Sequence, residues 1–181
     1  MASNLKEKYI KIVAPKLVAD FGVKNILAVP RLQKVVLNVG IPASNKDPKI
    51  QETVASVLSR ISGQKPVPTL AKQSISNFKI RKGMVVGYMV TLRGSKMYDF
   101  VDKLINVTLP RVRDFRGISE SNVDNNGNIS MGFREYIAFP EIKSDEVERV
   151  HGLQVTITTS IKDHDKGLAL FRELGLPFSK K

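Results

Sequence analysis

The side chains best suited to chemistry in this sequence are cations, and they gather in one stretch, residues 53–98. That stretch has no Asp or Glu, whereas an average usage of about one acidic residue in eight would place several there. Its basic residues are Arg60, Lys65, Lys72, Lys79, Arg81, Lys82, Arg93 and Lys96. Cations without neighbouring carboxylates suit a polyanion, because no side chain competes for them. The stretch therefore predicts an RNA-binding surface.

A polar and basic loop, residues 72–83, forms the centre of this stretch. The side chains expected to contact RNA there are Lys72, Ser74, Ser76, Asn77, Phe78, Lys79, Arg81 and Lys82. Two roles are open for Phe78, since an aromatic ring in such a loop either stacks on a base or anchors the loop to the core. The paired-aromatic motif of the common RNA-recognition module is missing, so we expect recognition of RNA shape and backbone.

A second basic cluster follows in residues 111–117, where Arg111, Arg113 and Arg116 accompany a single acid, Asp114. Alternating arginines on an extended segment can each donate two hydrogen bonds to a phosphate. The alternative is a surface patch of ion pairs that uses Asp114. Because one acid faces three arginines, we predict phosphate contact.

Charge is distributed unevenly along the chain, which has a net charge of +12 over 181 residues. Residues 60–116 carry +9, whereas residues 117–181 carry −2. We infer one face for nucleic acid and another for a different partner, such as a basic protein. The sequence has no cysteine, no apolar run of about 18 residues and no signal segment. These features predict a cytosolic chain without disulfides, thiolate zinc sites or membrane spans.

Nothing in the sequence forms a recognisable active site. The two histidines, His151 and His164, have no metal-ligand spacing, and neither a phosphate-binding loop nor a Gly-x-Ser-x-Gly nucleophile motif occurs. We therefore predict no catalytic residue, no metal site and no cofactor. Two alternatives to RNA binding stay open: a structural adaptor whose main partner is a protein, and a small enzyme with an unrecognised site.

The elements that must position the cations begin with three strands, predicted over residues 31–41, 85–93 and 153–161. In the first, alternation places Val35, Leu37, Val39 and Ile41 on one face and Lys34, Val36 and Asn38 on the other. In the second it places Val86, Tyr88, Val90 and Leu92 opposite Met89, Thr91 and Arg93. One apolar and one polar face are typical of an antiparallel sheet packed on one side, with the other side open to a ligand. Asn38 is an unusual residue for the middle of a strand, unless its side-chain amide has a functional role.

Helices are predicted over residues 3–21, 47–62, 95–109 and 165–174, with a short acidic one over residues 144–150. We expect Pro15 to bend or break the first, Asp47 to cap the second, Ser95 to cap the third and Pro110 to end it. Further short strands are expected over residues 67–71, 129–133 and 136–139, and a tight turn at Asn126-Gly127. The sequence thus predicts one α+β domain, residues 1–181, with an antiparallel sheet, helices on one face and the other face open to RNA.

Six segments occur in the same order and spacing as in bacterial large-subunit ribosomal protein five: residues 30–40, 61–66, 77–83, 90–94, 109–117 and 139–142. The string Leu-Pro-Arg-Val-Arg-Asp-Phe-Arg-Gly in residues 109–117 is long and specific, and the match covers nearly the whole chain. The sequence therefore resembles this ribosomal protein family. The resemblance implies a non-catalytic protein of the large subunit in the cytoplasm, which binds 5S rRNA and helps seat it in the central protuberance during translation.

The resemblance also implies particular contacts. Asn38, Gln64 and Thr91 match the family's 5S rRNA contacts, and Lys34 and Arg93, on the same predicted open faces, complete the expected site. The 72–83 loop resembles the family loop that reaches the P-site tRNA. The region after Pro110 resembles the part that meets a small-subunit head protein across an inter-subunit bridge. The 23S rRNA and other 5S-associated large-subunit proteins are the remaining expected partners.

Two departures from the family pattern lie in these contact regions. Ser76-Asn77 stands where many relatives have Ala-Gly, and Asn takes a left-handed conformation less readily than Gly. Asp124-Asn-Asn-Gly-Asn128 stands where many relatives have Asp-Gly-Arg-Gly-Asn, so an arginine is lost. The first departure bears on the tRNA contact and the second on the bridge.

Overall fold

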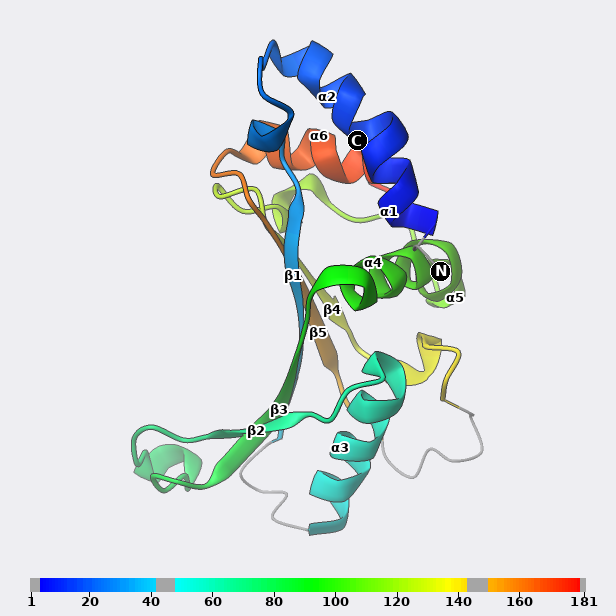
Figure 1. Ribbon diagram of the computed structural model, residues 1–181. Helices are drawn as coiled ribbons and strands as arrows, with labels where there is room; N and C mark the ends of the chain where they lie inside the picture. The colour runs from blue at the N-terminus through cyan, green and yellow to red at the C-terminus, as the bar shows by residue number, and fades with distance from the viewer. Residues whose placement is uncertain (1–3, 42–47, 143–149, 180–181) are drawn as a thin grey trace. The chain divides into compact units, whose positions relative to one another are not determined.

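The computed structural model of the chain (Figure 1) describes residues 4–41, 48–142 and 150–179. Its strands are β1 (Leu32–Gly40), β2 (Val67–Leu70), β3 (Val85–Leu92), β4 (Ile129–Phe133) and β5 (Leu153–Thr159). In the described residues they form a five-stranded antiparallel sheet in the order β2-β3-β1-β5-β4. The predicted α+β class is confirmed.

Burial alternates along β1 as the sequence predicts. Val35, Leu37 and Val39 are almost wholly buried, while Lys34 and Asn38 on the other face are half-buried. The same alternation in β5 buries every second residue: Val155, Ile157 and Thr159. In β3, Val90 and Leu92 are buried, but Val86 and Tyr88 on the same predicted face are only half-buried. The strands therefore leave a polar face that is partly open.

The helices are α1 (Asn4–Lys8), α2 (Ala14–Phe21), α3 (Pro48–Ser62), α4 (Gly94–Lys103), α5 (Leu109–Arg111) and α6 (His164–Leu174). A π-helical turn, Tyr9–Val13, joins α1 to α2, and another, Leu104–Thr108, joins α4 to α5. Short 3-10 turns occupy Ile26–Ala28, Ser76–Phe78, Glu120–Asn122 and Tyr136–Ala138. The predicted cap Asp47 lies outside the described residues, and so does the predicted acidic helix over residues 144–150, except for its last residue, Val150.

Each of the two helix prolines lies just after a π turn. The helix does not break at Pro15, because a π turn closes just before it, with the Ala14 N–H donating to the Tyr9 carbonyl. Of the two predicted effects of Pro15, the break is therefore wrong and the bend stays a prediction. The same wide turn precedes Pro110, so the prediction that Pro110 ends the helix is wrong, and α5 ends at Arg111. A π turn accommodates proline because one more residue separates donor from acceptor, which loosens the backbone where the ring would clash.

The first π turn also changes which residues are buried. Helical spacing in residues 3–21 also predicts an apolar stripe that includes Leu5, Ile12, Val13 and Leu17. Leu5, Val13 and Leu17 are buried, but Ile12 is 59% exposed. Ile12 lies inside the π turn, where successive residues are spaced differently around the helix axis than in a regular 3.6-residue repeat. The prediction that Ile12 belongs to the apolar stripe is therefore wrong.

Two further local predictions are wrong. Ser95 does not cap α4, because the helix begins one residue earlier and its N-cap is Arg93, which makes no side-chain capping bond. The segment around Tyr136 is a 3-10 turn and not a strand. There Tyr136 and Phe139 are buried, and a spacing of three residues suits a 3-10 turn, whereas a strand would bury alternate residues.

Contacts gather the chain into two compact units. The first unit comprises residues 1–35, 92–131 and 156–181, and its most buried side chains include Leu17, Leu104, Leu109, Leu170 and Phe171. The second comprises residues 36–91 and 132–155, and its most buried side chains include Leu37, Leu58, Tyr136 and Phe139. Across the described ranges, no helix is long and apolar enough to cross a membrane.

Candidate nucleic-acid interface

The second unit holds the three residues that match family contacts with 5S rRNA, and it joins two of them directly. Gln64 follows α3 in a turn where Gly63 adopts φ +61°, and the Gln64 N–H donates to Ser62 Oγ at 3.2 Å. From this turn the Gln64 Nε2 donates to the carbonyl oxygen of Thr91 at 3.3 Å. The bond fixes the exposed Gln64 amide beside the last residues of β3.

Asn38 lies on β1, the strand next to β3. The two strands approach closely, since a β-carbon built on Gly87 would lie 2.4 Å from the carbonyl oxygen of Val39. Asn38 and Thr91 are both half-buried, and neither side chain makes a hydrogen bond within the described part of the chain. A half-buried polar group normally has a partner, from protein, water or a ligand. Their placement on the polar face is as the sequence predicts.

Lys34 and Arg93, the other two residues expected at this site, belong to the first unit. Lys34 is half-buried on β1, and Arg93 is exposed where the chain leaves β3 and enters α4. Arg93 lines a hollow of about 500 Å³ together with Arg31 and Tyr98. Sequence reasoning did not single out Arg31, although its charge at the first residue of a predicted strand was the available indication.

The basic loop, residues 72–83, connects β2 to β3 and has a defined backbone. Ile75 and Ile80 form an isolated antiparallel bridge with two hydrogen bonds, of 2.9 and 3.1 Å between backbone N and O. Inside the bridge, Ser76–Phe78 is a 3-10 turn, and the Lys79 N–H donates to the Ser76 carbonyl at 2.9 Å. Beside it, the Lys82 N–H donates to Ser74 Oγ at 2.9 Å. The loop is thus a small closed hairpin.

The side chains of this hairpin point to solvent. Phe78 is 65% exposed, so the hypothesis that it anchors the loop to the core is wrong. The polar and basic residues expected to contact RNA are all exposed as well: Lys72, Ser74, Ser76, Asn77, Lys79, Arg81 and Lys82. Besides Gly83 (φ +86°), the residue of the loop with a left-handed conformation is Lys79, with φ +54°, and not Asn77. Lysine has no particular preference for that conformation, so its type gave no indication.

The second basic cluster also presents its cations to solvent. Arg111, Arg113 and Arg116 are exposed, and Asp114 adopts a left-handed conformation with φ +56°. Within the described residues, Asp114 forms no ion pair with any of these arginines. The alternative of an ion-pair patch built on Asp114 is therefore wrong, and the three guanidinium groups are available to an anion.

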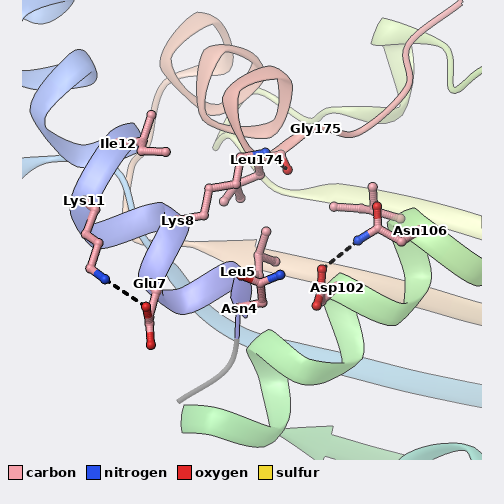
Figure 2. Close-up of a pocket in the computed structure, with 11 residues that line it drawn as sticks. Asn4, Leu5, Glu7, Lys8, Lys11, Ile12, Asp102, Asn106, Leu174 and Gly175 are labelled. Carbon is pink, nitrogen blue, oxygen red and sulfur yellow. Dashed lines mark hydrogen bonds and ion pairs between the residues drawn. The ribbon is translucent and has the colours of Figure 1, made fainter. Parts of the chain in front are cut away.

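A second hollow in the first unit, of about 420 Å³, lies between the N-terminal helices, α4 and the end of α6. Figure 2 shows that its charged groups already have partners inside it. Lys11 Nζ lies 2.9 Å from Glu7 Oε2, and Lys8 Nζ donates to the Leu174 carbonyl at 3.2 Å. Asp102 accepts a hydrogen bond from the Asn106 amide at 2.7 Å. These satisfied groups give no reason to assign a ligand there. Elsewhere in the described residues, no group of three metal-ligand side chains occurs.

Comparison with known proteins shows which family this chain belongs to. A model described as ribosomal protein L5 matches residues 25–81, and one described as the ribosomal L5P family C-terminus matches residues 85–178. The chain belongs to the ribosomal protein L5 family. As a member of this family it is a non-enzymatic protein of the large ribosomal subunit, located in the cytoplasmic ribosome.

Individual members of the L5 family match the chain from end to end. The large ribosomal subunit protein uL5 of Caldanaerobacter subterraneus is 51% identical over 178 residues, which cover 98% of this chain and 99% of the relative. The same protein of Syntrophotalea carbinolica is 50% identical over 181 residues, or 100% and 98% of the two chains. That of Mycoplasma mycoides is 48% identical over 180 residues, or 99% and 100%. The resemblance stated from the sequence is confirmed.

Proposed function

We propose that this L5-family protein binds 5S rRNA through the polar face of its sheet and attaches it to the central protuberance. The observation that carries the proposal is the bond from Gln64 Nε2 to the Thr91 carbonyl, which brings together two residues matched to 5S contacts on sequence grounds. That bond uses the Gln64 amide nitrogen and the Thr91 backbone. The Gln64 side-chain oxygen and the Thr91 hydroxyl are left to face a ligand, as is the Asn38 amide.

The chemistry of these groups suits structured RNA. Neutral amides and hydroxyls can hydrogen-bond to base edges and to the 2′-hydroxyl, which carry identity, whereas cations neutralise phosphates and set position. In this proposal Asn38, Gln64 and Thr91 make the first kind of contact, and Lys34 and Arg93 the second.

Two further contacts are proposed for the exposed basic elements. The closed hairpin, residues 72–83, contacts P-site tRNA, with Phe78 stacking on an exposed base and the surrounding cations on phosphates. The cluster of Arg111, Arg113 and Arg116 contacts RNA phosphates. Support comes from the 65% exposure of Phe78 and from the exposed guanidinium groups beside Asp114, which forms no ion pair within the described ranges.

The mildly acidic last third of the chain is proposed to meet proteins. The turn at residues 124–128 contacts a basic head protein of the small subunit across an inter-subunit bridge. Other 5S-associated large-subunit proteins are further partners of this part of the chain. The net charge of −2 over residues 117–181 supports a basic partner.

The proposal is tested by titrating the protein with 5S rRNA and with an unrelated structured RNA of equal length, at about 50 and 200 mM salt. Selective binding of 5S rRNA that persists at the higher salt is the expected result. Equal binding of both RNAs that collapses with salt would leave only a basic surface and overturn the proposal. A weak dependence on salt for both would favour the adaptor whose main partner is a protein.

A further inference from the structure

The hollow lined by Arg31 and Arg93 in the first unit has an unusual composition. Its remaining lining residues are Leu32, Gln33, Gly94, Met97 and Tyr98. Of the described residues that line it, none is acidic. Leu32, Met97 and Tyr98 are buried, while both arginines and Gln33 are exposed to solvent. Two arginines therefore line one open hollow whose described lining residues supply no counter-charge.

Neither guanidinium is engaged elsewhere. Among the described residues, Arg31 and Arg93 make no ion pair and no side-chain hydrogen bond. Two like charges at one hollow repel each other, and an anion placed between the two groups is attracted to both. The hollow therefore favours an anion.

Arg31 is held in place by its surroundings. Its backbone N–H donates to Ser160 Oγ at 3.1 Å, and its carbonyl accepts from the Ser160 N–H at 2.9 Å. On the other side, the Tyr9 hydroxyl donates to the carbonyl of Pro30 at 3.0 Å, and the Tyr9 and Tyr98 ring centroids lie 6.3 Å apart. Burial raises the pKa of Tyr98, and the charge of Arg31 opposes that rise, which indicates that the guanidinium lies near this ring. The backbone that carries Arg31 is thus fixed before any ligand arrives.

We infer that Arg31 and Arg93 together hold a single phosphodiester group of the bound RNA. Each guanidinium presents a planar fork of donors that matches two phosphate oxygens, so one phosphate can accept from both arginines at once. Arg93 follows Thr91 by two residues in the chain, so an RNA that reaches Thr91 brings its backbone toward Arg93. This inference rests on the proposed 5S rRNA function, and it adds Arg31 as a binding residue and a shared phosphate as the ligand.

The shared phosphate is tested by the salt dependence of 5S rRNA binding in four proteins: the unchanged chain, Arg31→Gln, Arg93→Gln and the double variant. Each neutralised phosphate contributes about 0.7–0.9 to the slope of log affinity against log salt. We expect the double variant to lose about 0.7–0.9 in total, because both arginines act on one group. The second substitution should then weaken binding less than it does alone.

Two more variants separate this site from general electrostatics. Arg31→Lys keeps the charge but loses the planar fork, so it should weaken binding while keeping most of the slope. Lys24→Gln removes an exposed cation of the same unit that does not line the hollow, and should leave affinity and slope unchanged. Thermal unfolding of every variant confirms that the fold is intact.

The outcomes distinguish this inference from the function on which it rests. If the unchanged chain does not prefer 5S rRNA to the matched RNA, the proposed function fails. If it does prefer 5S rRNA but Arg31→Gln binds equally well with the same slope, only the shared phosphate site fails. Independent effects that remove about twice the slope in the double variant would show two separate phosphates and would also overturn the inference.

Discussion

The backbone of Gly127 lies directly against the backbone of Gly167: a β-carbon built on Gly167 would be 2.5 Å from the Gly127 α-carbon. Gly127 stands in the tight turn predicted at Asn126-Gly127, which the structure confirms, with φ +70° and the Gly127 N–H donating to the Asp124 carbonyl at 3.0 Å. Gly167 is in the first turns of α6. The Thr159 hydroxyl donates to the Gly127 carbonyl at 2.9 Å, so the turn, β5 and α6 meet at one point.

Replacing Gly167 by alanine should destabilise the protein, although alanine is the better helix former by about 1 kcal/mol. The new methyl group would overlap the Gly127 backbone, which cannot rotate away as a side chain can, so we expect a net loss of about 1–3 kcal/mol. Urea unfolding measures the loss. Gly132→Ala is the matched control, since a β-carbon there meets nothing within 4 Å. A Gly167→Ala protein as stable as the control would contradict the close contact.

The stability of the same turn should depend on pH through Asp124. Burial acts to raise the pKa of Asp124, but hydrogen bonds from the Asn128 side chain and from the Asn128 and Asn126 N–H groups outweigh it and hold the pKa below 3.8. Because the folded pKa is the lower one, the ionised carboxylate contributes stability that is present above pH 3.8 and is lost as the pH falls through the folded pKa.

Asp124→Asn should therefore lower the free energy of unfolding by about 1 kcal/mol at neutral pH, where donors lose a charged acceptor at an exposed site. The difference from the unchanged chain should shrink as the pH falls below 3.8. Urea unfolding at a series of pH values measures it, with the exposed Asp99→Asn as control. A difference that stays constant down to the lowest pH would mean that the carboxylate's charge is not what supports the turn.

At the proposed 5S site, Asn38→Ala and Thr91→Ala should each weaken 5S rRNA binding by about 1–3 kcal/mol, because a dry interface would leave an RNA partner unsatisfied. The fold should be unaffected, since both side chains are half-buried and make no hydrogen bond in the described residues. Mobility-shift titration gives the affinities. Thr53→Ala on α3 is a control, because its hydroxyl donates to the Lys49 carbonyl of its own helix. Affinities equal to the control would remove both residues from the site.

Removing the aromatic ring of Phe78 should separate two RNA contacts. Phe78→Ala should spare 5S rRNA binding and stability, because the ring is 65% exposed, and should weaken tRNA binding to the P site by about 1–3 kcal/mol through lost stacking. Ribosomes carrying the variant are titrated with tRNA and compared with Val67→Ala, which removes an apolar side chain of similar exposure outside the loop. Loss of 5S binding in place of tRNA binding would assign the loop to the other RNA.

The residues that were predicted well are those governed by short repeats. Alternation along β1 placed Asn38 on the polar face, because a strand has few ways to bury valine and leucine on one side only. A glycine just after the last helical residue is an equally local signal, since Gly22 and Gly175 both adopt left-handed conformations at helix ends.

The residues that were predicted badly depend on contacts distant in sequence or on uncommon turns. A proline alone does not reveal that a π turn will precede it, so the paths at Pro15 and Pro110 could not be foreseen. The exposure of Phe78 follows from how the hairpin closes around it, which ring chemistry does not decide. Arg31 was missed because its neighbour in the hollow, Arg93, is far along the chain.

The bridge between Ile75 and Ile80 has a consequence for the thermodynamics of recognition. Ordering the backbone of a slack loop costs roughly 1–2 kcal/mol per residue, and that cost opposes binding whenever a partner must impose the order. The closed hairpin already has two backbone hydrogen bonds between Ile75 and Ile80, with N–O distances of 2.9 and 3.1 Å, so it docks nearly as a rigid body. Its association should therefore show a small heat-capacity change and a modest entropy loss, unlike a segment that folds on its partner.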